Sequence, residues 1–347
     1  MRAAPALIVC VVMLGGCTSA AGDGPNGSSD TSADPNSSTF GEPGTAGGRI
    51  LFTRSDELFS ANPDGTIESH VHAGCCARWS PDGTQILVPV LTDDGRITTG
   101  IVAADGTDLA TLPLDVPGLN LGAGAWSPDA ERFALQGWND GDSSQNGLYT
   151  SAIDGSDVVR LTTNRLGDRG HPGADIPAAY SPDGTRILFQ RSDPSGRGDR
   201  GRAAVWIIRT DGSGLRRLTP WLPGSWSGDA DWSPDGTQIV YDIVDFDEAD
   251  FEHHYRGEIR LIDADGTNDH MVRIDVPDGV SAIPPYFAKQ PTWSPDGSRI
   301  AFSMWPEWDT DGNQLFSMAP NGSDLRQMTT DLDIEHEWVD WATDGAP

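Results

Sequence analysis

The residues with the most unusual chemistry in this sequence are two adjacent cysteines, Cys75 and Cys76. Neighbouring Cα atoms are about 3.8 Å apart, below the usual disulfide range of about 4.4 to 6.8 Å, so a bond between these thiols closes a strained ring. The other two cysteines lie in the N-terminal segment considered below. In an oxidising compartment we therefore predict a vicinal disulfide, with two reduced thiols as the alternative. Such a bond is either a rigid lip of a binding site or only a lock on a loop.

A second cluster, residues 245–254, has the composition of a metal site. The stretch "DFDEADFEHH" holds five carboxylates and two imidazoles. Carboxylate oxygens suit Ca²⁺, and adjacent imidazoles suit a transition metal, so Ca²⁺ or another divalent cation is the cofactor that we consider. A solvated acidic loop is the alternative. The candidate ligands are Asp245, Asp247, Asp250, His253 and His254.

Other patterns approach known sites without completing them. His70 and His72 lie close to the two cysteines, but this cluster lacks the separated ligand pairs of zinc sites. The stretch "EWDTDGN" at 307–313 starts like an EF-hand loop and lacks its acidic twelfth residue, while "HEWVD" at 336–340 lacks the second histidine of the zincin motif. There is no GxSxG or P-loop motif. The sequence thus predicts no catalytic residue.

The overall charge limits the class of partner. The formal net charge is -29 and the sequence pI is about 4.3. Attraction to nucleic acid phosphates is excluded on this basis, and a cationic partner is favoured. The alternative is that the acidic residues only keep an exported protein soluble.

The N-terminus has the features of an export signal. One arginine, an apolar run over residues 3–14 and small residues before Cys17 are typical of a signal peptide, and the apolar run is too short to span a membrane. "LGGC" at residues 14–17 resembles the lipobox of bacterial lipoproteins, which implies cleavage before Cys17 and lipid attachment to it. We therefore expect residues 1–16 to be a signal peptide and the chain to be anchored by lipid on the outer face of the bacterial cell membrane. Residues 17–47 are rich in Gly, Ser, Pro and Asp and are predicted to be a disordered linker.

An internal repeat decides the fold of residues 48–347. In each "WSPDG" copy Pro fixes one corner, Asp supports the turn and Gly accepts a positive φ, with an aromatic residue before and a strand-like run after. Each copy therefore predicts a β-hairpin. Three copies are complete, at Trp79, Trp232 and Trp293, and three are close relatives: "WSPDA" at Trp126, "YSPDG" at Tyr180 and "WATDG" at Trp341.

A second series of turns, such as "AIDGS" around Asp154, alternates with the first. Together the two series define units of four short antiparallel strands. Six such units cannot bury their own faces separately but bury one another in a ring. The last turn, at Trp341, has no following strand, whereas "GRILFTR" from Gly48 lacks a preceding one. We therefore predict an all-β, six-bladed propeller closed by pairing of its N- and C-terminal segments.

These residues give the resemblance to a known family. The repeated "WSPDG" pattern over residues 48–347 resembles the TolB-type propeller repeat, a relative of WD40 blades. The resemblance implies a six-bladed propeller. TolB is a soluble periplasmic protein with an extra N-terminal α/β domain, so its transport role is not transferred to this chain. Related propellers also accompany enzymes, and the fold therefore leaves the function open.

The strand order assigns the tryptophans to two groups. The turns after the first and third strands share one face, and the longer second-to-third loops and blade crossings share the other. Residues 242–257 are predicted to be one of these loops, and residues 283–291 and 331–340 two of the crossings. Tryptophans of the repeated turn are expected to pack between blades. The tryptophans of the long-loop face are candidates for a binding surface: Trp138, Trp221, Trp226, Trp305, Trp308 and Trp338.

The sequence favours a binding module over an enzyme. The predicted function is an extracytoplasmic, monomeric propeller that binds a protein, peptide or glycan through its long-loop face. The rival is a metal-dependent carbohydrate-active enzyme, a lyase or hydrolase, with its site over the central channel. Such a site would draw on the histidines of the variable loops: His72, His171, His253, His254 and His336.

Overall fold

The structure is a computed structural model of the full chain. It describes residues 47–114, 116–164, 173–193, 202–223, 225–226, 228–246, 255–276, 288–304, 313–330 and 335–343. The predicted signal peptide, the lipidated Cys17 and nearly all of the linker lie outside these ranges. Within the described residues, no helix has both the length and the apolar character needed to cross a membrane.

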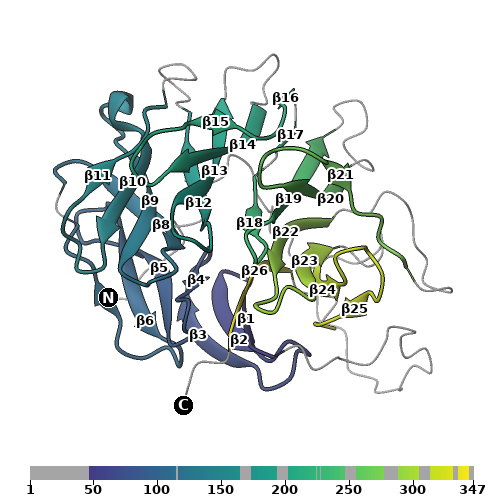
Figure 1. The fold of residues 1–347 in the computed structure, drawn as a ribbon. Helices are drawn as coiled ribbons and strands as arrows, with labels where there is room; N and C mark the ends of the chain where they lie inside the picture. The colour runs from purple at the N-terminus through teal and green to yellow at the C-terminus, as the bar shows by residue number, and fades with distance from the viewer. Residues whose placement is uncertain are drawn as a thin grey trace, which may run out of the picture.

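The described chain forms six antiparallel sheets arranged as the blades of a propeller (Figure 1). Blade 1 contains β1 (Arg49–Arg54), β2 (Glu57–Ala61), β3 (Ser69–Ala73) and β26 (His336–Ala342). Blade 2 contains β4 (Arg78–Trp79), β5 (Gln85–Leu91), β6 (Ile97–Ala103) and β7 (Ala110–Thr111). Blade 3 contains β8 (Asn120–Trp126), β9 (Arg132–Trp138), β10 (Gly147–Ala152) and β11 (Val159–Arg160), with the 3-10 turn η1 (Ser143–Gln145) before β10.

The other three blades follow the same order. Blade 4 contains β12 (Asp175–Tyr180), β13 (Arg186–Asp193), β14 (Arg202–Arg209), β15 (Arg216–Arg217) and β16 (Leu222–Pro223). Blade 5 contains β17 (Ser225–Trp226), β18 (Ala230–Trp232), β19 (Gln238–Phe246), β20 (Tyr255–Asp263) and β21 (His270–Met271). Blade 6 contains β22 (Ala288–Trp293), β23 (Ile300–Met304), β24 (Gln314–Met318) and β25 (Arg326–Gln327). The six-bladed, four-stranded plan is confirmed, and β16 and β17 extend blades 4 and 5 by one short strand each.

The repeated turn forms because its own side chains accept hydrogen bonds from the hydroxyl and backbone N–H groups of the turn. In blade 4, the Ser181 hydroxyl donates to Asp183 Oδ1 at 2.6 Å, and the Thr185 backbone N–H donates to the same oxygen at 3.0 Å. Gly184 has a φ of 68°, a value that glycine adopts without strain. The hydrogen bond from Ser181 holds the pKa of Asp183 below its usual value. The same arrangement recurs in blades 2, 5 and 6.

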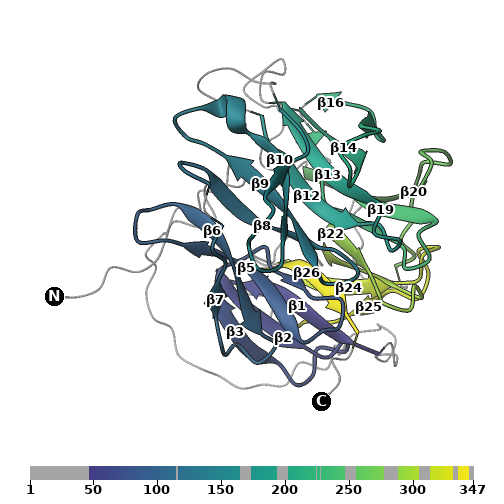
Figure 2. The ribbon, with the colours of Figure 1, turned by 60° about the vertical axis from the view of Figure 1, so that its left-hand side comes forward.

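The ring closes as the sequence predicts. The C-terminal strand β26 pairs with β1, with Trp341 opposite Ile50. Figures 1 and 2 both show the yellow β26 beside the purple β1, so residues near the two ends of the propeller share one sheet. Around the axis each innermost strand contacts the next, in the order β4, β8, β12, β18, β22, β26 and back to β4.

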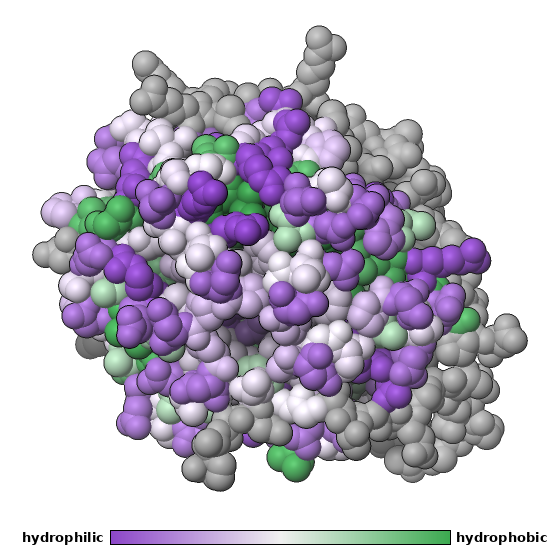
Figure 3. Space-filling view, viewed as in Figure 1, coloured by the Kyte–Doolittle hydropathy of each residue, from purple (hydrophilic) through white to green (hydrophobic). Residues whose placement is uncertain are grey.

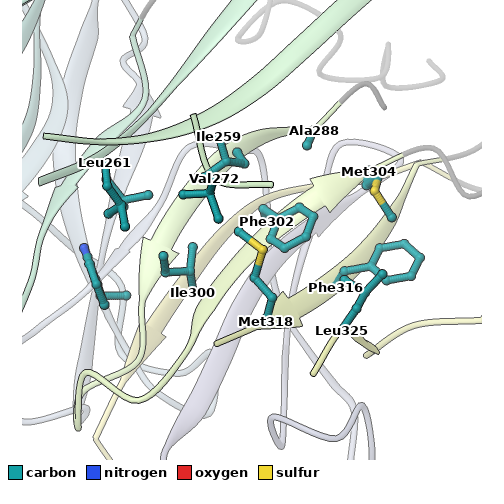
Figure 4. Packing of buried hydrophobic residues seen from close by; sticks show 12 residues of the cluster. Ile259, Leu261, Val272, Ala288, Ile300, Phe302, Met304, Phe316, Met318 and Leu325 are labelled. Atoms are coloured by element: carbon teal, nitrogen blue, oxygen red, sulfur yellow. The ribbon is translucent and has the colours of Figure 1, made fainter. Parts of the chain in front are cut away.

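The hydrophobic core lies between the blades. In Figure 4, Ile259, Leu261 and Val272 of blade 5 pack against side chains of blade 6, among them Ile300 and Phe302. Trp293, at the end of an innermost strand, belongs to this cluster and is 5 % exposed. Each of the other repeat tryptophans is likewise buried: Trp79, Trp126, Trp232 and Trp341. The prediction that these side chains pack between blades is therefore confirmed.

Several segments predicted as loops are strands instead. Residues 242–246 belong to β19, residues 288–291 to β22, and residues 336–340 to β26. These segments contain polar residues such as Asp242 and Gln290, which suggested loops, yet both side chains are buried. They are accommodated because hydrogen bonds across blade boundaries satisfy them, and a polarity pattern does not contain that information.

Candidate functional site

The two faces of the propeller differ in what their connections contain. The face that carries the repeated turns, here called the turn face, repeats one self-satisfied structure from blade to blade. The opposite face, here called the long-connection face, carries the second-to-third strand connections and the crossings between blades. The innermost strands begin on this second face, for example β12 at Asp175 and β26 at His336. Chemistry that differs between blades is therefore concentrated there.

The predicted binding tryptophans do not form one cluster. Trp138 is half-buried at the end of β9 in blade 3, and Trp338 is half-buried in β26 near the axis, where its φ is 56°. Trp338 thus lies in a strand, whereas the sequence predicts a loop at this position. Trp226 lies in β17, and Trp305 and Trp308 fall outside the described residues.

Trp221 is the predicted tryptophan with the most developed surroundings. It follows β15 in the crossing from blade 4 to blade 5, and its ring centroid lies 6.1 Å from that of Trp206. Arg202 and Arg217 lie over its ring at 4.7 and 5.9 Å from the centroid. Sequence reasoning missed Trp206, which it treated only as one residue of an alternating strand. The partly buried indole pair is thus flanked by the guanidinium groups of Arg202 and Arg217.

The second feature of this face is a charged group beside the axis, the channel-mouth cluster: Asp229, Asp242, Lys289, Gln290 and Glu337. The Asp242 carboxylate accepts hydrogen bonds from the backbone N–H groups of Gly228 (3.2 Å), Asp229 (3.3 Å) and Gln290 (2.9 Å). Lys289 forms an ion pair with Glu337. The cluster therefore joins blades 5, 6 and 1.

The two aspartates of this cluster are protonated more easily than usual. Burial, and then the charge of Asp242, raises the pKa of Asp229, and burial raises that of Asp242, so that the coupled pair has pKa values of about 7 and about 6. No hydrogen bond to the Asp229 carboxylate is found among the described residues, and its side chain is only half-buried. Asp229 therefore presents a proton-exchanging carboxyl group at the channel mouth.

Deeper along the axis, two aspartates connect neighbouring blades. Asp231 Oδ2 accepts the backbone N–H of Trp293 at 2.9 Å and the Thr292 hydroxyl at 3.0 Å, which ties blade 5 to blade 6. Asp340 Oδ2 accepts the backbone N–H of Trp79 at 2.7 Å, which ties blade 1 to blade 2. Burial raises the pKa of Asp231 to about 6 and also raises that of Asp340.

These axial carboxylates were missed by the sequence analysis. Both tying aspartates stand directly before the tryptophan of a repeat, in "DWSPDG" and "DWATDG". That position is Arg, Ala or Thr in the other copies. The variation within an otherwise constant motif was the available signal, because residues before the tryptophan lie at the axis.

The raised pKa values predict how stability depends on pH. A carboxyl group with a folded-state pKa above its unfolded value of about 3.9 binds more protons when folded, so its stabilising effect is present below about pH 4 and is lost as pH rises through about 7. Replacing Asp229 by Asn removes the cost of ionising it. We expect Asp229→Asn to be more stable than the wild type by about 1–2 kcal/mol at pH 8 and by about a third as much at pH 5, because pH 5 lies near the lower end of the window between the two pKa values.

This prediction is checked by urea unfolding at pH 5 and pH 8. Asp154→Asn is the matched control, because it also removes one aspartate charge but from the turn face, where hydrogen bonds from Ser156 lower the pKa of Asp154. The control should show no gain at pH 8. Parallel pH profiles for Asp229→Asn and the wild type would show that Asp229 ionises normally.

Cys75 and Cys76 lie at the same end of the ring, just before β4. Their sulfur atoms are 2.6 Å apart; Cys75 is buried, and Cys76 is half-buried with a φ of 61°. The arrangement brings the two sulfurs together, and the vicinal disulfide stays a prediction.

The metal candidates are not assembled within the described part of the structure. His70 contacts Glu57 at 2.7 Å, and the His72 ring lies 2.6 Å from its neighbour's carbonyl oxygen. Asp247, Asp250, His253, His254 and His171 lie outside the described residues, and for Asp245 only the backbone, in β19, is described. His72 is in the outermost strand of blade 1 and His336 in the innermost. Among described residues, no group of three His, Cys, Asp or Glu side chains could hold a metal ion.

Comparison with known proteins places the fold more firmly than the function. No family model matches the sequence. An uncharacterized protein of Agrobacterium fabrum is 28 % identical over 223 residues, which are 64 % of this chain and 67 % of that protein. An uncharacterized peptidase of Bacillus subtilis, YuxL, is 31 % identical over 126 residues, or 36 % of this chain and only 16 % of the peptidase.

Solved structures share the whole architecture. TolB from Acinetobacter baumannii superposes with a TM-score of 0.62 and 18 % identity over 87 % of this chain and 68 % of that one. The fold is a TolB-like six-bladed propeller. A putative TolB from Agrobacterium tumefaciens gives 0.51 and 24 % identity over 72 % of this chain and 83 % of that one. A chain of the nidogen/laminin complex gives 0.58 and 10 % identity over 86 % of this chain and its own full length.

Proposed function

We propose that this TolB-like propeller is an exported, lipid-anchored binding module that holds a protein or peptide partner on its long-connection face. The observation that carries the proposal is the channel-mouth cluster, in which blades 5, 6 and 1 each contribute a different charged group: Asp229, Lys289 and Glu337. Identical motifs repeated in every blade present the same surface six times and cannot distinguish one partner from another. Charged groups that differ from blade to blade around one axis can do so.

The chemistry of this face suits a partner that carries a positive charge. The chain is strongly acidic overall, and the Asp229–Asp242 pair gains charge above neutral pH. A cationic side chain placed at the mouth would lower the pKa values of this pair and release a proton. The indole pair of Trp206 and Trp221 offers apolar area for the remainder of a peptide.

Export and anchoring rest on the N-terminal sequence. The apolar run before "LGGC" and the Gly- and Ser-rich residues after it are the arrangement expected for a domain tethered to a membrane by a lipid on Cys17. The TolB-named relatives and the nidogen/laminin chain support a propeller that contacts proteins. The rival enzyme would draw on five histidines, of which the structure describes His72 and His336, and these lie in the outermost and innermost strands of blade 1.

The binding proposal is tested with peptides selected from a displayed random library on the immobilised full chain. We expect selected peptides to contain Lys or Arg, and their affinity to fall about tenfold in Asp229→Asn and in Trp221→Ala. Asp154→Asn removes the same charge from the turn face and should leave affinity unchanged. Equal losses in Asp229→Asn and Asp154→Asn would reduce the effect to net charge and overturn the proposal, as would a selection that yields no binding peptide.

A further inference from the structure

The repeats provide an internal comparison at the start of the second strand of each blade. In blade 3, Arg132 begins β9 and donates to Asp157 at 2.8 Å, and in blade 6 Arg299, just before β23, donates to Asp324 at the same distance. In both blades the acceptor stands 25 residues later, directly after the second turn, at a positive φ of 51° and 54°. Both blades thus neutralise this arginine with an aspartate of the same blade.

Blade 4 keeps the arginine and loses its partner. Arg186 begins β13, and the residue after the second turn is Gly214, with a φ of 68°. The residue opposite Arg186 on the next strand is Arg209, where blade 3 has Ala152 opposite Arg132. Like charges directly opposite on neighbouring strands are destabilising. Compared with blade 3, blade 4 therefore has Gly214 in place of the aspartate and Arg209 in place of the alanine.

No direct ion pair holds these two arginines within the described residues. Among the described residues, neither Arg186 nor Arg209 forms an ion pair within 4 Å, whereas Arg191 and Arg202 of the same blade do. The nearby turn aspartates take their hydrogen bonds from their own turns, since Asp183 accepts from Ser181 and Thr185, and Asp211 accepts from Ser213. Each also interacts electrostatically with one of the two arginines, Asp183 with Arg186 and Asp211 with Arg209, without a direct contact. Arg216, on the outer strand, adds a further positive charge and donates to the carbonyl oxygens of Ala264 and Asp265.

The whole region has the opposite charge balance from the rest of the chain. Residues 160–217 hold eleven of the 23 basic residues and only six acidic ones. The remainder of the chain is strongly acidic, since the net charge is -29. In blade 4, two arginines that are opposite in the strand register thus have no direct ion pair among the described residues, although carboxylates are abundant elsewhere in the chain.

We propose that Arg186 and Arg209 form a binding site for an oxyanion, a phosphate or carboxylate group, on the turn face of blade 4. Arg186 and Arg209 are opposite in the register of β13 and β14, and each guanidinium group carries a planar set of N–H donors that can hold such a group bidentately. The bound group takes the place of the aspartate that blades 3 and 6 supply. This site lies on the opposite face from the channel-mouth cluster, so it stands or falls independently of the proposed function.

Gly214→Asp is the decisive variant, because it restores the aspartate that blades 2, 3 and 6 carry at this position. A Cβ atom at Gly214 would lie 3.6 Å from the nearest atoms of Arg209, an ordinary contact, and aspartate already occupies this conformation in blades 2, 3 and 6. Gly214→Asn is the matched control, since it has the same shape without the charge. Arg209→Ala removes half of the site.

The experiment measures the melting temperature of the full chain at pH 7 and constant ionic strength while chloride is replaced by inorganic phosphate or by acetate. We expect a saturable rise of about 2 °C for the wild type and Gly214→Asn, and no such rise for Gly214→Asp and Arg209→Ala. A general salt effect acts on all four proteins alike. A response to phosphate alone or to acetate alone identifies the group that the site prefers. Equal responses in all four, or no response in the wild type, would overturn the proposal.

Discussion

Deleting residues 336–347 is expected to abolish cooperative folding. The deletion removes β26, which pairs with β1, and exposes Ile50, Leu51 and Phe52, all of which are fully buried. Removal of one buried tryptophan alone costs about 3–5 kcal/mol, and Trp341 is 7 % exposed in this strand. Together with the lost strand pairing, the penalty reaches the total stability of about 5–15 kcal/mol that is typical of a domain.

The deletion is compared with the wild type by near-UV circular dichroism, thermal unfolding and size-exclusion chromatography. We expect the truncated chain to show no cooperative transition and to aggregate through its unpaired edge. Deleting only residues 344–347 is the control, because it leaves β26 complete and should preserve the transition. Trp341→Ala should lie between the two. A truncated chain that melts like the wild type would show that the ring does not depend on this strand.

The second large effect is expected at Asp242. This carboxylate is 3 % exposed and accepts three backbone N–H groups, two from the segment before β18 and one from β22. Asp242→Ala leaves these donors buried without a partner, and we expect a loss of about 3–5 kcal/mol. Asp242→Asn retains one acceptor oxygen and should cost less. The raised pKa shows that ionising Asp242 costs free energy. This cost is smaller than the cost of leaving the three backbone N–H groups without an acceptor.

Urea unfolding at pH 7 measures this effect. Asp183→Ala is the control, since it also removes an aspartate that accepts backbone and side-chain hydrogen bonds, but in a turn where water can replace it; about 1 kcal/mol is expected there. If Asp242→Ala were no more destabilising than Asp183→Ala, the carboxylate would not be what joins blades 5 and 6.

Together with the pH prediction for Asp229, the Asp242 variants would show that the two aspartates of the channel-mouth cluster have different roles. Asp242 joins blades 5 and 6 through backbone donors, whereas Asp229 has no such bond among the described residues and faces the channel mouth. The face seen in Figure 3 is predominantly hydrophilic, with its hydrophobic residues in small separate groups. Recognition by a molecule of this kind would depend on charged and hydrogen-bonding groups more than on a broad apolar patch.

The repeated turns were predictable because their cause is local. Ser, Asp, Gly and the following Thr or Ser satisfy one another within five residues, as Ser233, Asp235 and Thr237 do in blade 5. A pattern confined to adjacent residues can be read in one dimension, and six copies of it leave few architectures. The burial of the repeat tryptophans follows from the same periodicity.

The site residues were harder to predict because their partners are distant in sequence. The sequence predicts loops at Trp338 and at Asp242. The structure places Trp338 in β26 and buries Asp242 in β19. Gln290 receives the Trp338 backbone N–H across 48 residues. A polar residue can be buried when it has a hydrogen-bond partner. Partners that are 48 residues apart can be identified only once the closed ring has placed them side by side.

The amino-acid sequence by itself determined that this protein is a ring of six hairpin-based blades joined end to end, since short-range turn chemistry repeats along it. Only the tertiary structure decided which polar residues face the axis and which arginines lack an acid. The physical reason is that hydrogen bonds and charge compensation depend on distances in space, and the propeller brings together residues from blades that are far apart in the chain.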